Sequence, residues 1–258
     1  MIDLSGRCAL VTGSSRGIGR ACAIRLAQAG ADVAINYVSS RTAAEEVAGV
    51  IEAMGRRAVL IKADVSETED VEDLASAIQS EFGRLDILIS NAATGGFRPL
   101  LATTHRQFSA AFATNVESLL HCLRYMLSLL RSQPDRPRRA KVIALSSHGS
   151  QYALPMYGLV GMTKAALESL VRHAAAEFGG QGINVNVLLS GLVDTDAVRD
   201  IPNHDAIFER RNQRSLTGDR PLDVQDVADV ALFLASDLSD MVQGQTLVVD
   251  AGVAVTLG

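Results

Sequence analysis

The chain has 258 residues, of which 48% are hydrophobic, 21% charged and 4% aromatic, and its formal net charge is −5. This apolar content excludes a disordered chain, and three cysteines exclude a disulfide framework. The acidic balance and the lack of tryptophan argue against a nucleic-acid surface. No apolar run reaches the roughly 20 residues of a membrane helix, and no leader precedes the first strand, so we expect a cytoplasmic protein.

Short apolar or β-branched runs alternate with longer segments of helical period, the pattern of repeated βαβ units. The predicted strands are Cys8–Thr12, Asp32–Tyr37, Ala58–Lys62, Leu85–Ser90, Lys141–Ser146, Ile183–Leu189 and Thr246–Asp250. The predicted helices are Gly17–Ala29, Arg41–Met54, Glu67–Phe82, His105–Arg131, Tyr157–Phe178 and Asp223–Ser236. Because the strands are almost continuously apolar, helices should cover both sheet faces. We predict one domain, 1–258: a Rossmann-like, doubly wound, seven-stranded parallel α/β sheet in a three-layer sandwich.

Two irregular segments interrupt this alternation. The arginine-rich stretch from Arg131 to Lys141 contains two prolines and is interpreted as a solvated loop. Residues 194–222, after the sixth strand, are expected to form a substrate lid, because ligands in such folds bind beyond the carboxyl ends of the strands. Its apolar residues could line an acyl tunnel, and arginines such as Arg211 could meet an acidic carrier protein or a coenzyme A phosphate. An amphipathic helix with a solvated basic face is an equal alternative.

A glycine-rich turn follows the first predicted strand, and a helix begins within it. Its sequence is Thr12-Gly13-Ser14-Ser15-Arg16-Gly17-Ile18-Gly19. Glycine lets the backbone turn tightly and approach a pyrophosphate, while the helix N-terminus offers free N–H groups to the phosphates. A purely structural turn is the alternative, but the strand before it and the helix after it favour a dinucleotide site.

The end of the second predicted strand determines which dinucleotide fits. An acidic residue there would bind an adenosine ribose and repel a 2′-phosphate. The segment Asn36-Tyr37-Val38-Ser39-Ser40-Arg41 contains no carboxylate. Because Arg16 and Arg41 can each bring a guanidinium to a phosphate, NADP(H) is favoured over NAD(H). Arg41 as a solvated residue at a helix start is the alternative.

The spacing of the glycine turn resembles that of the short-chain dehydrogenase/reductase family, and the resemblance runs along the whole chain. It implies cofactor contacts at Asp64-Val65, at Asn91-Ala92-Ala93, where alanine replaces a usual glycine, and in the segment Ser190–Thr195. Asn115 matches the helix asparagine that helps hold the catalytic lysine through water. The expected cofactor contacts are Gly13, Ser15, Arg16, Gly17, Ile18, Gly19, Tyr37, Ser39, Arg41, Asp64, Val65, Asn91, Ala92, Ala93, Lys164, Gly191, Val193 and Thr195.

The catalytic motif departs from the usual family pattern, in which a tyrosine stands four residues before the lysine. Val160 occupies that position before Lys164, and valine has no proton to give. Tyr157 stands seven residues before Lys164 instead. Both spacings keep the two side chains on one helix face, but seven residues span about 10.5 Å of rise against about 6 Å for four. We therefore expect the acid about one turn farther from the lysine.

This displacement suits a reaction in which hydride arrives at C3 of a 2-enoyl thioester and negative charge develops on the distant thioester oxygen, which Tyr157 could stabilise. The Tyr-x6-Lys spacing is similar to that of enoyl-acyl-carrier-protein reductases, and the Thr12–Gly17, Asn91–Ala93 and Asp194–Asp196 segments resemble their NADPH-dependent FabL branch. The resemblance implies reduction of trans-2-enoyl thioesters in fatty-acid biosynthesis by a homotetramer. It also implies that acyl carrier protein can carry the substrate. Its implied catalytic residues are Tyr157, Lys164, Ser147 and Asn115, with Lys164 holding the nicotinamide ribose and lowering the tyrosine pKa.

Other interpretations remain open. A 3-ketoacyl or other ketone reductase or alcohol dehydrogenase on a hydrophobic substrate could carry the shifted tyrosine. A non-catalytic NADP(H)-binding protein is the second alternative, because Val160 replaces the usual acid. His148 is interpreted as a hydrogen-bonded loop residue, and the five histidines show no metal-ligand spacing, so we expect no metal.

Overall fold

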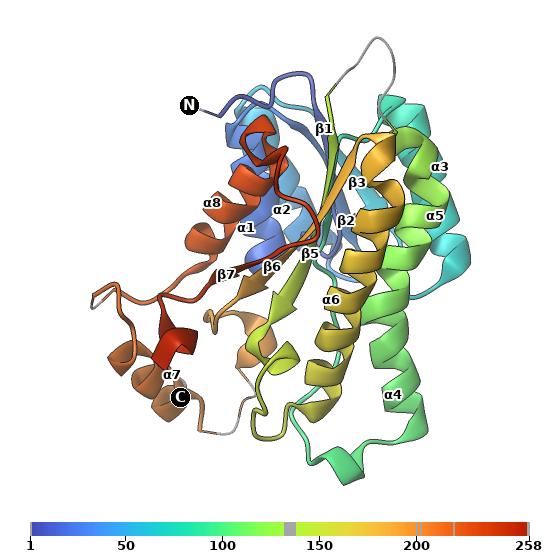
Figure 1. Ribbon diagram of the computed structural model, residues 1–258. Helices are drawn as coiled ribbons and strands as arrows, with labels where there is room; N and C mark the ends of the chain where they lie inside the picture. The colour runs from blue at the N-terminus through green and yellow to red at the C-terminus, as the bar shows by residue number, and fades with distance from the viewer. Residues whose placement is uncertain (1, 132–137, 200, 202, 219, 257–258) are drawn as a thin grey trace.

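The computed structural model describes residues 2–131, 138–199, 201, 203–218 and 220–256, and it confirms the predicted fold class. Seven parallel strands form one sheet in the order β3-β2-β1-β4-β5-β6-β7 (Figure 1). The strands are β1 (Cys8–Val11), β2 (Asp32–Tyr37), β3 (Ala58–Lys62), β4 (Ile87–Ser90), β5 (Ala140–Ser147), β6 (Ile183–Ser190) and β7 (Thr246–Val249).

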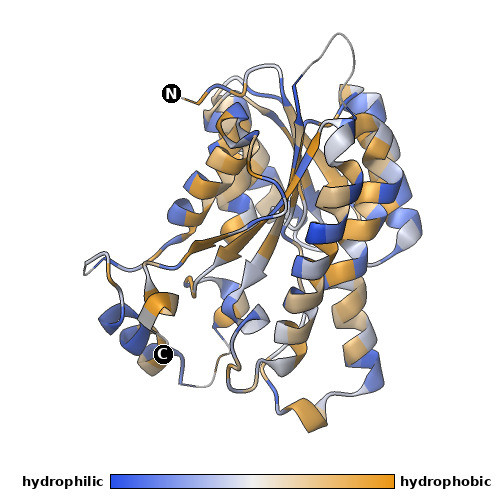
Figure 2. Cartoon of the chain, viewed as in Figure 1, coloured by the Kyte–Doolittle hydropathy of each residue, from blue (hydrophilic) through white to orange (hydrophobic). Residues whose placement is uncertain are grey.

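Helices cover both faces of this sheet, as Figure 1 shows. On one side lie α1 (Gly17–Gln28), α2 (Arg41–Ala53) and α8 (Val224–Ala235); on the other lie α3 (Thr68–Phe82), α5 (Ser118–Leu130) and α6 (Gly158–Phe178). Successive strand residues face opposite sides, so Val11 packs into one hydrophobic cluster and Leu10 into the other. Figure 2 shows the matching hydrophobic colour on the strands and on the inner helix faces.

The strand order places a ligand crevice between β1 and β4. The chain runs from β1 outward through β2 to β3, and then returns to build β4 to β7 on the other side of β1. The connections that follow β1 and β4 therefore diverge, and a doubly wound sheet opens at such a point beyond the carboxyl ends of its strands. The glycine turn and the Asn91-Ala92-Ala93 segment both begin there.

Three predictions about helices were wrong. The continuous helix His105–Arg131 is instead α4 (His105–Phe112), a π-helix (Ala113–Glu117) and α5, and the side-chain amide of Asn115, within the π-helix, bonds to the neighbouring loop. The lid contains α7 (His204–Gln213), which was not predicted. The helix α6 begins at Gly158, one residue later than predicted, so Tyr157 is its N-cap residue, without a capping hydrogen bond from its side chain.

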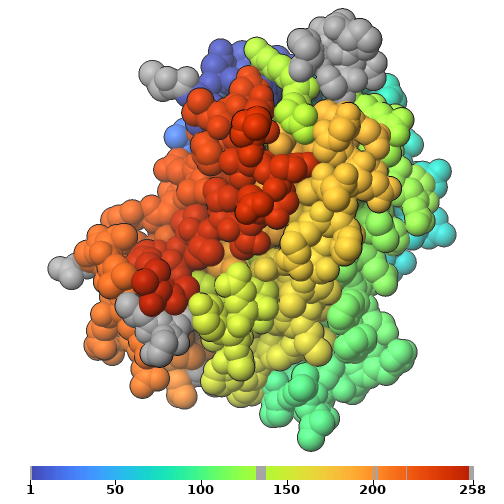
Figure 3. All heavy atoms as spheres, in the orientation of Figure 1, coloured from blue at the N-terminus to red at the C-terminus, as the bar shows by residue number. Residues whose placement is uncertain are grey.

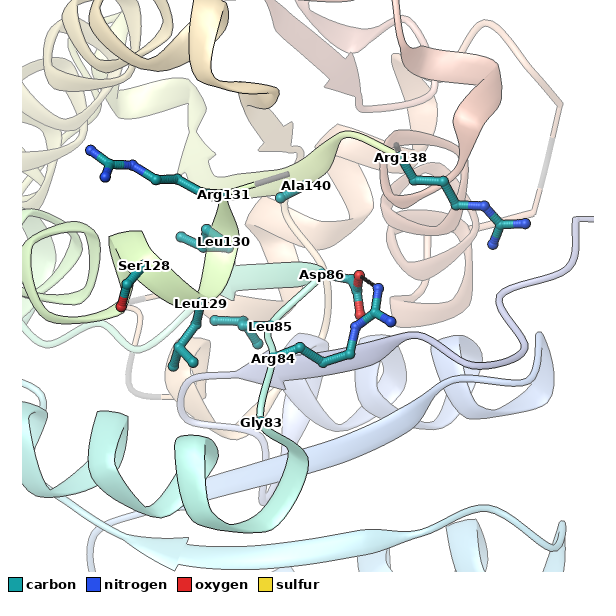
Figure 4. Close-up of a pocket in the computed structure, with 10 residues that line it drawn as sticks. All are labelled: Gly83, Arg84, Leu85, Asp86, Ser128, Leu129, Leu130, Arg131, Arg138 and Ala140. Atoms are coloured by element: carbon teal, nitrogen blue, oxygen red, sulfur yellow. Dashed lines mark hydrogen bonds and ion pairs between the residues drawn. The ribbon is translucent and has the colours of Figure 1, made fainter. Parts of the chain in front are cut away.

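The amino end of the sheet carries a small cavity of about 40 Å³ (Figure 4). Two of its arginines already have partners, since Arg84 pairs with Asp86 and Arg131 Nε donates to Gln181 Oε1 at 2.8 Å. Residues 132–137 of the arginine-rich stretch lie outside the described residues. The stretch was wrongly extended to Lys141, which is a buried residue of β5. None of the described helices is long and apolar enough to cross a membrane.

Candidate active site

The glycine turn is tied directly to the segment that follows β4. Thr12 Oγ1 accepts hydrogen bonds from the backbone N–H groups of Asn91 (2.9 Å) and Ala92 (3.0 Å). Asn91 Nδ2 donates in return to the carbonyl oxygens of Thr12 (2.9 Å) and Gly13 (3.1 Å). A Cβ on Gly19 would lie 2.5 Å from Asn91 Nδ2, so only glycine permits this approach. Two predicted cofactor segments therefore form one cradle.

This cradle has the features that a dinucleotide phosphate site needs. Gly13 and Gly17 have φ angles of +62° and +56°, which side chains rarely adopt. The N-terminus of α1 opens directly after the turn, with Arg16 exposed at its cap. Among the described residues, Ser14 Oγ is buried without a hydrogen-bond partner. Ser15 and Ile18 belong to the same turn. Because the turn combines left-handed glycines, a helix N-terminus and an unpaired buried hydroxyl, its residues fit a bound dinucleotide.

The end of β2 joins the cradle through a buried amide. Asn36 Oδ1 accepts from the Gly13 N–H at 3.0 Å, and Asn36 Nδ2 donates to the Ala63 carbonyl at 2.9 Å. Tyr37 is buried in the hydrophobic core beneath this point. Ser39 and Arg41 are exposed, and Arg41 Nε pairs with Glu45 Oε1 at 2.8 Å. The guanidinium groups of Arg16 and Arg41, near this rim, are therefore accessible to a ligand from solvent.

The remaining predicted cofactor segments lie at the same edge of the sheet. Asp64 follows β3, where its Oδ1 accepts from Ser66 N at 3.0 Å and Ser66 Oγ at 2.7 Å. Thr195 Cγ2 would lie 3.5 Å from a Cβ on Gly17, so the start of the lid contacts the glycine turn. Val65 and Val193 are buried, and Ala93 is exposed. Gly191 lies too close to Asp250 to carry a side chain, because a Cβ there would lie 2.8 Å from the Asp250 Cβ.

The tyrosine and the serine meet beyond the end of β5. Ser147 ends β5, and its Oγ shares a hydrogen bond of 3.2 Å with the Tyr157 hydroxyl. Phe97 stacks on the Tyr157 ring with centroids 5.4 Å apart. Gly149 leaves room for the same ring, because a Cβ there would lie 2.5 Å from Tyr157 Cδ1. The phenol is therefore held between two loops and one hydroxyl.

Lys164 is turned toward the strand. Its Nζ donates to the Leu145 carbonyl at 2.7 Å, and burial lowers the pKa of Lys164 to about 8, although the charge of Glu168 acts to raise it. Burial raises the pKa of Tyr157, with the hydrogen bond from Ser147 acting in the opposite direction. The expectation that Lys164 lowers the tyrosine pKa is therefore wrong for this arrangement, because the ammonium bonds to β5 and burial dominates at the phenol.

Asn115 bonds to the residue next to the lysine. Its Nδ2 donates to Thr163 Oγ1 at 2.8 Å and to the Thr94 carbonyl at 2.9 Å, while its Oδ1 accepts from the Thr94 N–H at 2.7 Å. The side chain thus fastens the loop after β4 to α6. The predicted contact with Lys164 through water stays a prediction.

The lid and the C-terminal segment close the other side. His148 Nε2 and Asp250 Oδ2 lie 2.9 Å apart, so the interpretation of His148 as a hydrogen-bonded loop residue is confirmed. Arg211 is buried, with only 7% of its surface exposed, and burial lowers its pKa; it was therefore wrongly grouped with arginines that face a partner. In Figure 3 the yellow-green residues around 148–156 lie between α6 and the red C-terminal segment.

Several residues of the site were not predicted. Glu168 could have been found, because it stands four residues after Lys164 and so shares its helix face. Phe97 gave no such signal, and neither did the bond from Thr12, a member of the predicted glycine turn, to Asn91, since these partners lie 60 and 79 positions apart in sequence and meet only in the folded chain.

Comparisons with known proteins match this arrangement over nearly the whole chain. The family model described as "Enoyl-(Acyl carrier protein) reductase" matches residues 13–254. A 1-cyclohexenylcarbonyl-CoA reductase from Streptomyces collinus is 35% identical, covering 95% of this chain and 86% of the relative. The chain belongs to the short-chain dehydrogenase/reductase family.

Other members of this family are similar to the same extent. The 3-oxoacyl-[acyl-carrier-protein] reductase FabG of Staphylococcus aureus is 32% identical, with 95% of this chain and 97% of that protein covered. The crystal structure of a short chain dehydrogenase from Burkholderia cenocepacia in complex with NADP has a TM-score of 0.85 and 32% identity, covering 97% and 99% of the two chains. The protein is thus an oxidoreductase of this family.

Proposed function

We propose that the protein reduces the C2=C3 double bond of trans-2-enoyl thioesters with NADPH. The observation that carries this proposal is the position of Tyr157, which stands seven residues before Lys164 and ahead of α6 instead of within it. The description of the matching family model supports it, as does the name of the Streptomyces collinus relative, a reductase of a cyclohexenyl thioester.

The rim of the cradle supports NADPH as the cofactor. No carboxylate stands at the end of β2 to repel a 2′-phosphate, and the exposed Arg16 and Arg41 can bind one. Arg41 is also paired with Glu45, so Arg16 is the freer of the two guanidinium groups. The NADP bound by the Burkholderia cenocepacia relative agrees with this assignment.

Several residues of the chain have separate roles in such a reduction. When bound, NADPH supplies the hydride that goes to C3. Tyr157 donates a hydrogen bond to the thioester oxygen, where negative charge develops, and a raised pKa keeps its proton in place at neutral pH. Ser147 and Phe97 orient the phenol, and the Lys164 ammonium would bind the nicotinamide ribose. The enolate then takes up a proton at C2 from solvent water.

A second candidate is reduction of a 3-ketoacyl thioester. The hydrogen bond of 3.2 Å between Ser147 and Tyr157 favours it, because the same pair could polarise a ketone and pass the phenolic proton to its oxygen. FabG of Staphylococcus aureus, by its name, acts on such a substrate.

One assay separates these candidates. NADPH consumption is followed at 340 nm with crotonyl-CoA and, in parallel, with acetoacetyl-CoA. We expect turnover of crotonyl-CoA, a loss of about 10²- to 10³-fold in kcat for Tyr157→Phe, and an unchanged Kd for NADPH. Tyr152→Phe is the matched control, because this tyrosine is exposed and contacts His148 edge-on. Consumption with acetoacetyl-CoA alone would overturn the first candidate in favour of the second.

We further propose a cytoplasmic homotetramer that acts in fatty-acid biosynthesis on carrier-bound acyl chains. Exposed apolar side chains around the starts of α4 and α6 support an interface between copies; they include Leu100, Leu101, Phe108 and Met162. Sedimentation equilibrium should give four times the chain mass of 27.3 kDa, and a single-chain mass would contradict this assembly.

A further inference from the structure

Glu168 is a buried carboxylate beside the proposed active site, and the mechanism above does not use it. It lies one turn after Lys164 on the inner face of α6, and only 7% of its surface is exposed. Its Oε1 accepts a hydrogen bond of 2.6 Å from Ser146 Oγ, which is also buried. Acidic side chains are seldom buried so completely without a partner or a role.

Glu168 and Lys164 attach α6 to two consecutive residues of β5. Lys164 bonds to the carbonyl of Leu145, Glu168 bonds to the hydroxyl of Ser146, and the next residue is Ser147, which holds Tyr157. The two side chains therefore fix the end of the strand from which the tyrosine is oriented. They also place opposite charges one helical turn apart in a region from which water is excluded.

The surroundings of Lys164 offer its ammonium little else that is charged. From β5 it bonds to the Leu145 carbonyl, and from the π-helix the neutral Asn115 bonds to its neighbour Thr163. Tyr157 is neutral at physiological pH. In the described part of the chain, the charge that acts on Lys164 is that of Glu168, and it opposes the effect of burial.

We propose that Glu168 is a positioning residue: its carboxylate keeps Lys164 in the ammonium form, and its hydrogen bond to Ser146 holds the end of β5. The catalytic part of this inference rests on the proposed function, because a neutral lysine would bind the nicotinamide ribose less well. The electrostatic part concerns only the chain itself and can be measured without any turnover.

The sequence makes the direct measurement simple, because it contains only three lysines, Lys62, Lys141 and Lys164. Lysine labelled with ¹³C at Cε gives three signals whose shifts follow protonation, and Lys164→Met assigns the signal of interest. In Glu168→Gln the amide oxygen can still accept from Ser146, so the shape is kept and the charge is removed. We expect the Lys164 midpoint to fall by about one unit in this variant.

The pH profile of kcat/KM gives the second readout. Activity needs the ammonium, so it falls as the pH rises through the Lys164 pKa, and the fall should begin at lower pH in Glu168→Gln. The loss relative to wild type should grow from nearly none at pH 6 to about fivefold at pH 8. Ser146→Ala is the matched control, because it removes the hydrogen bond and keeps the charge; its loss should be equal at both pH values.

An unchanged Lys164 midpoint in Glu168→Gln overturns the proposal, whatever the kinetics show. A shifted midpoint with no turnover of either thioester by the wild type would instead overturn the proposed function and leave the role of Glu168 standing. In Glu168→Asp the Lys164 midpoint should fall by no more than about half as much as in Glu168→Gln, since aspartate restores the charge at a greater distance.

Discussion

Gly149→Ala is the substitution that most directly tests whether Tyr157 is held in a working position. The added methyl group would lie 2.5 Å from Cδ1 and 2.6 Å from Cε1 of the Tyr157 ring. Because carbon atoms in contact stay about 3.5 Å apart, the ring must withdraw by about 1 Å. The phenol, now 3.2 Å from Ser147 Oγ, would then leave hydrogen-bond range.

A displacement of this size at a reacting group costs about 10²-fold in rate, or about 2.7 kcal/mol in the barrier. We expect that loss in kcat for crotonyl-CoA, with the Kd for NADPH from fluorescence titration little changed, since the glycine turn is untouched. Gly180→Ala is the matched control, because a Cβ there meets no atom within 4 Å. Wild-type turnover in a folded Gly149→Ala protein would refute the argument that this contact sets the position of the phenol.

Three further predictions concern the cofactor cradle, a helix and the buried lysine. Arg16→Ala should raise the KM for NADPH about tenfold and leave that for NADH unchanged in steady-state assays, because it removes a charge that only a 2′-phosphate uses. Gly19→Ala should abolish NADPH binding in calorimetry, since its Cβ would lie 2.5 Å from the Gly13 carbonyl oxygen, whereas Gly49→Ala, in open space within α2, should stabilise the fold by about 1 kcal/mol in urea unfolding. The pKa of Lys164 is about 8 in the folded chain against 10.5 for the free side chain, so the unfolded state binds more protons between these values and stability rises with pH. Relative to Lys164→Met, the free energy of unfolding should therefore increase by about 3 kcal/mol from pH 7.5 to 10.5; equal slopes in urea titrations would contradict it.

The local sequence pattern was sufficient for the sheet. The predicted bounds of β2 and β3 match the structure, and the other strands differ by one or two residues at an end, because buried parallel strands are short apolar runs with clear glycine or polar boundaries. The predicted cofactor segments also meet at one edge, since parallel strands bring their carboxyl ends together. Family motifs were needed to name the residues after β3 and β4.

What the sequence did not predict depends on contacts between distant segments. Asn115, in the π-helix, bonds through its amide to Thr94, 21 residues away, and the apolar period of the surrounding residues gives no sign of either feature. The helix α7 is mostly polar, as Figure 2 shows, so it lacks the apolar stripe that marks a surface helix. Arg211 is buried within it, where the charge of Asp250, from the far end of the chain, acts against the lowering of its pKa by burial.

The start of α6 explains how the shifted tyrosine and the fold fit together. Met156 has a φ of +59°, a strained conformation for this side chain, and it turns the chain so that Tyr157 points to Ser147 before the helix begins. Val160, at the usual acid position, is buried against Gly95, whose Cβ position lies 2.3 Å from a valine methyl carbon. A tyrosine at 160 would overfill that contact, and in this chain the phenol reaches the serine from the turn that precedes the helix. The loop after β4, the turn at Met156 and the seven-residue spacing are therefore parts of one arrangement.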